Sequence, residues 1–123
     1  MSSSPLRNAE GLTANQSLVR SYSWLLAGLL GVGALFVLGE QPFAVGLVPV
    51  PFDKLAHFVV FGSFFLILDS ALVLPLWLAL MIPLLISAAD EFHQMFLPGR
   101  QPGLEDWLAG LCGVALAAWW RHR

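Results

Sequence analysis

Four apolar segments of membrane-spanning length dominate this sequence. They cover about residues 22–38, 55–74, 77–97 and 104–120, and short stretches rich in Pro, Gly or charged residues separate them. A helix needs about 17–25 residues to cross the hydrocarbon core of a bilayer, so each segment is long enough for one span. Because 58% of the residues are hydrophobic and only 11% are charged, the composition favours an integral membrane protein over a soluble domain. We therefore predict an all-α, polytopic membrane protein, a bundle of four transmembrane helices.

The first 21 residues form a polar N-terminal tail that differs from the rest of the chain. They are rich in Ser, Asn and Gln and contain Pro5 and Gly11, so we expect a mostly disordered tail with a short helix near residues 14–20. The apolar run that follows is long for a cleaved signal peptide, and no Ala-x-Ala site follows Leu38. The predicted domains are therefore a tail (1–21) and a four-helix membrane domain (22–120).

The distribution of basic residues predicts the orientation in the membrane. Four spans place both termini on one side, and the termini carry four arginines: Arg7, Arg20, Arg121 and Arg123. The opposite side, which includes a proline-rich loop at residues 39–52, has only Lys54 and Arg100. Because cytoplasmic segments carry an excess of Lys and Arg, we expect both termini in the cytoplasm and the tail to be cytoplasmic.

Charged and polar side chains interrupt the apolar sequence at three places. A charge near the centre of a lipid-facing helix costs about 2.5–3.5 kcal/mol, so several together suggest a purpose. In each of the second and third spans, helical geometry gathers the polar residues on one arc of about 100° to 160°. All three places lie at the same end of the predicted bundle, the outer one. The candidate residues of this polar site are Asp53, Lys54, His57, Asp90, Glu91, His93, Gln94, Arg100 and Asp106.

Three sequence blocks in this region resemble the VanZ-like family in order and spacing. They are Asp53-Lys54-Leu55-Ala56-His57-Phe58, then Asp90-Glu91-Phe92-His93-Gln94-Met95-Phe96-Leu97-Pro98-Gly99-Arg100, then Asp106-Trp107-Leu108-Ala109. The resemblance covers about residues 50–117. One position departs from the family pattern, because Gly110 stands where the pattern has Asn. The resemblance implies a small protein of the bacterial cytoplasmic (inner) membrane, and the family's named member is associated with resistance to the glycopeptide teicoplanin.

Several functions fit these residues. The charged groups could form an interhelical network that needs no ligand. They could instead bind an envelope lipid headgroup or a glycopeptide, with Lys54 and Arg100 holding phosphate or carboxylate groups. A membrane hydrolase or transferase acting on a lipid-linked substrate is the alternative, with His57 or Glu91 as general base, although no nucleophile stands out. A transporter is disfavoured, since four spans leave little room for a pathway in a monomer.

The sequence assigns no metal and no other cofactor. The zinc motif of two histidines on one helix is missing, and Asp90-x-x-His93 alone keeps metal-assisted hydrolysis as an open alternative. The expected partner is the lipid bilayer, and no basic cluster is large enough to attract nucleic acid. Cys112 is the single cysteine and cannot form an intramolecular disulfide. The oligomeric state stays open.

Overall fold

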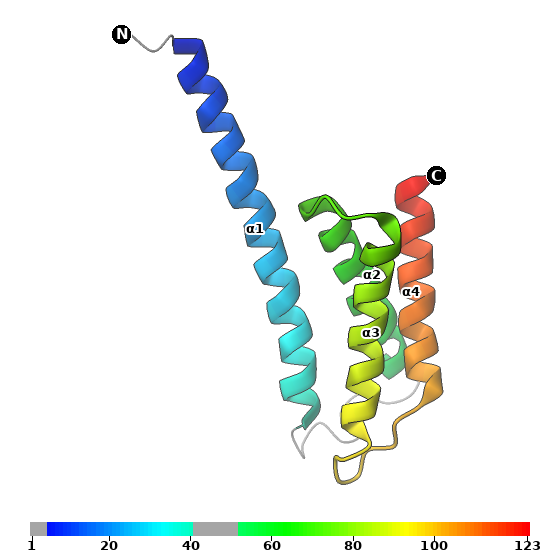
Figure 1. Ribbon diagram of the computed structural model, residues 1–123. Helices are drawn as coiled ribbons and strands as arrows, with labels where there is room; N and C mark the ends of the chain where they lie inside the picture. The colour runs from blue at the N-terminus through cyan, green and yellow to red at the C-terminus, as the bar shows by residue number, and fades with distance from the viewer. Residues whose placement is uncertain (1–4, 41–51) are drawn as a thin grey trace.

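The computed structural model describes residues 5–40 and 52–123, which form an all-α bundle (Figure 1). The described chain has four helices: α1 (Pro5–Glu40), α2 (Phe52–Ala71), α3 (Leu76–Gln94) and α4 (Leu104–His122). They run alternately up and down, so α1 begins and α4 ends at the same end of the bundle. The predicted all-α fold with four helices is confirmed. The proline-rich loop predicted at residues 39–52 lies largely outside the described ranges.

Three of the described helices are long and apolar enough to cross a membrane. The spans lie at Thr13–Val37, Phe52–Ala71 and Leu76–Gln94. The fourth predicted span, now α4, does not meet this criterion. It carries Glu105 and Asp106 in its first turn and Arg121 and His122 in its last, which lower its average hydropathy. Its apolar middle still packs against the other helices, because Val114 is part of the buried core.

α1 is longer at its start than the sequence led us to expect. It begins at Pro5 and includes most of the segment for which we predicted a mostly disordered tail. Proline is favoured at the first helical position, where its missing N–H costs no hydrogen bond. The residues that follow include Leu, Arg, Ala, Glu and Gln, which are good helix formers. Residues 13–20 are exposed, so local propensity rather than packing supports this part of the helix.

α2 lies at the centre of the bundle and makes backbone contact with α4. A Cβ atom built on Gly113 would overlap the carbonyl oxygen of Phe58, and one built on Gly62 would lie 2.9 Å from the carbonyl oxygen of Gly113. Only glycine allows such an approach, and small residues are typical of close helix contacts in membrane proteins. Above and below this contact, Phe61, Phe65, Ala79 and Val114 form a buried core.

A second apolar cluster joins α1 to the other helices. Val32 of α1 packs with Phe64 and Leu68 of α2. The outer surfaces of the helices expose many large apolar side chains, among them Leu29, Leu30 and Trp77. In water such a surface would be costly, whereas lipid tails cover it without penalty.

The fold brings the polar sequence blocks to one end of the bundle. α2 and α4 begin at that end and α3 finishes there, before a connection that reverses the chain (Figure 1). The connection includes Gly99, whose φ of 75° lies in the left-handed region that favours glycine. At the opposite end Asp69 accepts from Arg121 at 3.1 Å and lies 3.2 Å from His122 Nε2.

Candidate functional site

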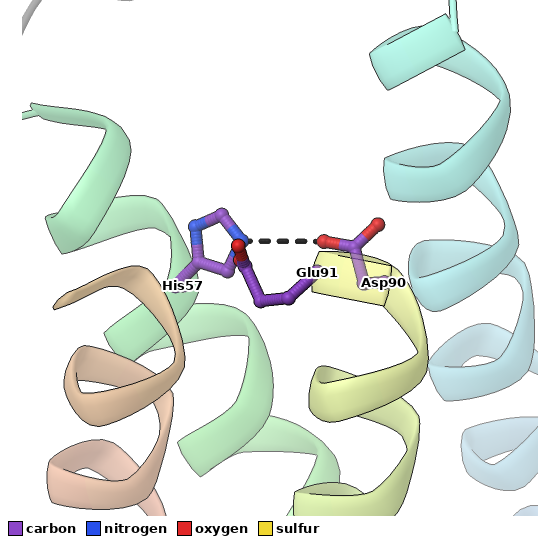
Figure 2. Close-up of side chains that lie close together, drawn as sticks. All are labelled: His57, Asp90 and Glu91. Atoms are coloured by element: carbon purple, nitrogen blue, oxygen red, sulfur yellow. Dashed lines mark hydrogen bonds and ion pairs between the residues drawn. The ribbon is translucent and has the colours of Figure 1, made fainter. Parts of the chain in front are cut away.

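A polar cluster lies where the ends of α2, α3 and α4 meet. We define it by eight residues: Asp53, Lys54, His57, Asp90, Glu91, Gln94, Glu105 and Asp106. Seven of these belong to the predicted site, and the structure therefore brings most of the predicted residues together. Figure 2 shows the innermost part, in which His57 of α2 points toward Asp90 and Glu91 of α3.

The imidazole of His57 has a defined orientation. Its Nδ1 lies 3.0 Å from the backbone carbonyl oxygen of Asp53, one turn earlier in α2. A carbonyl oxygen can only accept, so Nδ1 carries the proton and donates. The other ring nitrogen, Nε2, lies 3.3 Å from Asp90 Oδ2 and 3.4 Å from Glu91 Oε1. One ring nitrogen thus faces two carboxylate oxygens at nearly equal distances.

All three of these side chains are taken out of solvent. The side chains of His57, Asp90 and Glu91 are 8%, 3% and 12% exposed. Burying a charge is costly unless a partner compensates it. The main electrostatic question at this site is therefore which group compensates the charge of the two carboxylates.

Further hydrogen bonds hold the two carboxylates in place. Gln94 Nε2 donates to Asp90 Oδ2 at 3.1 Å, one turn along α3. The backbone N–H of Gly103 donates to Glu91 Oε2 at 3.1 Å. Gly103 is the N-cap of α4, so Glu91 ties the end of α3 to the positive end of the α4 dipole. Glu91 Oε1 is buried and accepts no hydrogen bond from the described residues.

Lys54 links the acids of the other part of the cluster. Its Nζ lies 3.2 Å from Glu105 Oε2, 3.3 Å from Asp106 Oδ1 and 3.9 Å from Asp53 Oδ2. One ammonium group is thus shared by three acids, two from the start of α4 and one from the start of α2. Asp106 is buried, whereas the Glu105 side chain is 76% exposed.

Glu105 is the cluster member that sequence reasoning missed. Its position beside Asp106 in the first turn of the fourth helix was the only signal, and such first-turn acids are common helix stabilisers. Only the distance to Lys54 shows that Glu105 belongs with the cluster.

An apolar cavity adjoins the polar cluster between α3 and the start of α4. Its volume is about 580 Å³, and its lining residues are Ala88, Glu91, Phe92, Met95, Pro102, Gly103, Leu104 and Trp107. Glu91 is the only charged residue of this lining, and it is also a member of the cluster. Trp107 is held in place because its Nε1 donates to the carbonyl oxygen of Leu84 at 3.2 Å. The polar and apolar parts of the site therefore meet at Glu91.

Two predicted site residues lie elsewhere. His93 stacks on Phe36 of α1, with ring centroids 5.9 Å apart, and so belongs to the contact between α1 and α3. Arg100 is half-buried on the connection after Gly99, and its backbone N–H donates to Leu97 at 3.2 Å. The ion pairs of the cluster given above do not include its guanidinium.

Gly110 occupies a tight position beneath the cluster. A Cβ atom there would lie 3.0 Å from Ser87 Oγ and 3.3 Å from the Phe61 ring. An Asn side chain, which the VanZ-like pattern has at this position, would require Ser87 to move. Ser87 Oγ is fully buried and has no hydrogen-bond partner among the described residues. Beside Gly110, where the family pattern has Asn, the Ser87 hydroxyl thus lacks a hydrogen-bond partner among the described residues.

The arrangement supports three kinds of chemistry. An oriented imidazole between carboxylates can move a proton. The excess of acids can bind amines or hydroxyls, and His57 with Asp90 and Glu91 presents one nitrogen and two carboxylate groups within 4.8 Å, a donor set that suits a metal ion. The single cysteine, Cys112, is exposed on α4 and is no nucleophile for this site.

Comparison with known proteins agrees with this fold and its sequence blocks. The model of one protein family, described as VanZ/LLP1, matches residues 5–121. No match was found among curated proteins or among solved structures. The match includes all four helices and every residue of the polar cluster. With three apolar helices of spanning length, this multi-pass membrane protein belongs to the VanZ/LLP1 family.

Proposed function

We propose that this chain acts in the bacterial cell envelope by binding an amphiphilic envelope molecule, either a lipid headgroup or a glycopeptide, at the polar cluster. The observation that carries the proposal is the junction at Glu91, where the buried part of the polar cluster meets an apolar cavity of about 580 Å³. A ligand with an apolar part and a polar part can satisfy both surfaces at once.

The charges of the cluster indicate which polar groups the ligand presents. Five acids, Asp53, Asp90, Glu91, Glu105 and Asp106, face one lysine and one histidine. Amines and hydroxyls complement carboxylates, so the ligand presents such donors near Glu91. Lys54 is engaged by three acids, and phosphate binding would require it to give up at least one of them.

The proposed location is the outer face of the cytoplasmic membrane, with both termini in the cytoplasm. The bias of Arg toward the termini supports this orientation. The cluster then lies near the outer headgroup region, where envelope lipids and externally added glycopeptides are accessible. Through its family, the chain is further proposed to take part in resistance to teicoplanin.

Binding can be tested with the full chain in nanodiscs, with teicoplanin and a polyprenyl phosphate lipid as separate probes. Trp107 lines the cavity, so ligand entry should change its fluorescence, and Trp107→Phe identifies that part of the signal. We expect Glu91→Gln to weaken binding of the active probe at least about tenfold, since a charge-assisted hydrogen bond contributes about 1.5–3 kcal/mol.

Asp69→Asn is the matched control, because Asp69 is an acid in ion pairs at the opposite end of the bundle. Equal affinities of wild type, Glu91→Gln and Asp69→Asn for both probes would refute binding at the cluster. In cells, expression in a sensitive bacterium should raise the teicoplanin concentration needed to stop growth, and Glu91→Gln should remove the increase.

The orientation of His57 favours a second candidate function, a membrane hydrolase or transferase acting on a lipid-linked envelope substrate. An imidazole fixed by a backbone carbonyl and flanked by carboxylates has the geometry of a general base. Incubation with a polyprenyl diphosphate, followed by mass spectrometry of the products, tests this function. Turnover by wild type that His57→Gln abolishes, with lipid binding retained, would make the chain an enzyme; the absence of product would leave the binding function.

A further inference from the structure

The starting point is an electrostatic conflict around His57. Its Nδ1 donates to the Asp53 carbonyl, so in the neutral ring the lone pair of Nε2 faces outward. At 3.3 and 3.4 Å from that lone pair lie oxygens of Asp90 and Glu91. Three electron-rich atoms would repel one another in this buried place unless a positive charge lies between them.

A proton on Nε2 relieves the conflict only in part. An imidazolium carries one positive charge, while the two carboxylates, when both are ionised, carry two negative charges. The nearest other cation of the cluster is Lys54, whose Nζ is bound by Asp106 and Glu105. A divalent cation beside a neutral His57 would balance both carboxylates, which suits side chains that are 12% exposed or less.

The distances agree with a coordination sphere. Zn²⁺ binds imidazole nitrogen and carboxylate oxygen at about 2.0–2.2 Å, so neighbouring ligands of a tetrahedral site are roughly 3.3–3.5 Å apart. The two separations from Nε2, 3.3 and 3.4 Å, fall in this range, and all three ligand atoms lie within 4.8 Å of one another. In addition, Glu91 Oε1 is buried and accepts no hydrogen bond from the described residues, so it keeps its lone pairs available.

The surroundings of the three side chains are those that metal ligands require. A metal-binding histidine donates its other N–H to a carbonyl or carboxylate, as His57 does to Asp53. Gln94 donates to Asp90, and the N–H of Gly103 donates to Glu91. Each of the three groups is therefore oriented by a hydrogen bond with a further residue.

We propose that His57 Nε2 and the carboxylates of Asp90 and Glu91 bind one divalent transition-metal cation, for which Zn²⁺ is the best match in donor set and geometry. Three protein ligands leave one tetrahedral position open to water or to an oxygen of a bound molecule. Glu91 also lines the cavity, so a molecule in the cavity would reach this open position. The inference requires only the three side chains and does not depend on the envelope ligand proposed above.

The test uses the full chain purified in detergent without a histidine tag, stripped with a chelator and dialysed. We expect about one Zn²⁺ per chain after titration, a melting temperature that rises with Zn²⁺ but not with Mg²⁺, and visible absorption bands of tetrahedral Co²⁺ when cobalt replaces zinc. His57→Gln and Glu91→Gln should each weaken zinc binding at least about 100-fold, and Gln94→Ala about tenfold through loss of orientation.

The control is His122→Gln, which removes a histidine that also faces an acid, Asp69, but at the other end of the bundle. It should keep full zinc binding. If stripped wild type takes up no stoichiometric metal, or if His57→Gln binds zinc as tightly as His122→Gln does, the proposal is wrong. Zinc stoichiometry, melting temperature and cobalt absorption are all measured on the wild-type chain. The test therefore remains decisive even if a variant fails to fold. If the wild-type chain binds teicoplanin or the polyprenyl phosphate lipid but no metal, only this inference is wrong. If it binds zinc but neither of those two probes, only the proposed envelope ligand is wrong.

Discussion

The contact between α2 and α4 allows the sharpest prediction about stability, which concerns Gly113→Ala. A methyl group at this position would overlap the carbonyl oxygen of Phe58 and would lie 2.9 Å from its carbonyl carbon. Both obstacles are backbone atoms of a regular helix, so no side-chain rotation can relieve the overlap. The two helices must move apart, which also opens the core that Phe61 and Val114 form between them.

The loss of unfolding free energy depends on whether side chains or the backbone must move. Overpacking a core costs about 1–3 kcal/mol when side chains can adjust, and more when the backbone must shift. We therefore expect Gly113→Ala to cost at least about 3 kcal/mol. Gly62→Ala should cost less, about 1–3 kcal/mol, because its added Cβ would be 2.9 Å from the Gly113 carbonyl oxygen, a milder overlap with backbone than at Gly113.

Gly31→Ala is the matched control, because Gly31 is also a helical glycine but has nothing within 4 Å of an added Cβ. This change should be neutral or stabilising by up to about 1 kcal/mol, since alanine favours helices over glycine. Thermal unfolding in one detergent measures the series, and about 4 °C per kcal/mol predicts a loss of about 12 °C for Gly113→Ala. Melting of Gly113→Ala within 3 °C (roughly the scale of 1 kcal/mol) of Gly31→Ala would show that the close helix contact is wrong.

Three further predictions concern the buried hydroxyl, the orientation and the opposite end of the bundle. Ser87→Ala removes a buried hydroxyl without a partner among the described residues, so it should raise the free energy of unfolding by about 1 kcal/mol. Ser63→Ala, at an exposed site of α2, is the control and should leave the free energy of unfolding unchanged. A large loss of stability in Ser87→Ala would reveal a hydrogen bond to Ser87. With Cys112 replaced by Ser, a cysteine at exposed Gln101 should react with an impermeant maleimide only from outside intact cells, and labelling only from the cytoplasmic side would reverse the topology. Asp69→Asn breaks ion pairs with Arg121 and His122, whose side chains are 47% and 43% exposed, and should cost less than about 1 kcal/mol, a difference that high salt should reduce.

The architecture could be predicted because hydropathy and length alone determine where a chain can cross a bilayer. The spans predicted at 55–74 and 77–97 overlap α2 (Phe52–Ala71) and α3 (Leu76–Gln94) with shifts of about three residues. The lack of an apolar face was the weaker guide, because good helix formers alone extend the polar start of α1 to Pro5. For α4, charges at both ends lower the hydropathy of a helix whose middle is apolar and buried.

The site could be predicted only as far as chain connectivity determines it. Alternating helices necessarily bring Asp53, Asp90 and Asp106 to one end, and the structure has them there. Which histidine faces the acids depends on the rotation of α3 against α2, and no pattern within one helix contains that rotation. The sequence left both histidines as candidates, with His57 as a general base and His93 on the same helical face as Asp90. In the structure His57 faces Asp90 and His93 stacks on Phe36 of α1. Glu105 was missed for the same reason, since its link to Lys54 joins two helices.

The two parts of the polar cluster differ in how far a purely structural role explains them. Around Lys54, an ammonium group lies among three acids, and two of these, Glu105 and Asp53, have side chains that are 76% and 29% exposed. Water and an interhelical network therefore account for this part without a ligand. Around His57, two buried carboxylates share a ring whose second nitrogen is already committed to a backbone carbonyl. A network selected only for stability would gain from apolar residues at Asp90 and Glu91, because an imperfectly compensated buried pair is commonly less stable than well-packed apolar side chains. The acids on α3 therefore require an explanation that the acids around Lys54 do not, and a bound cation or ligand at Glu91 provides one.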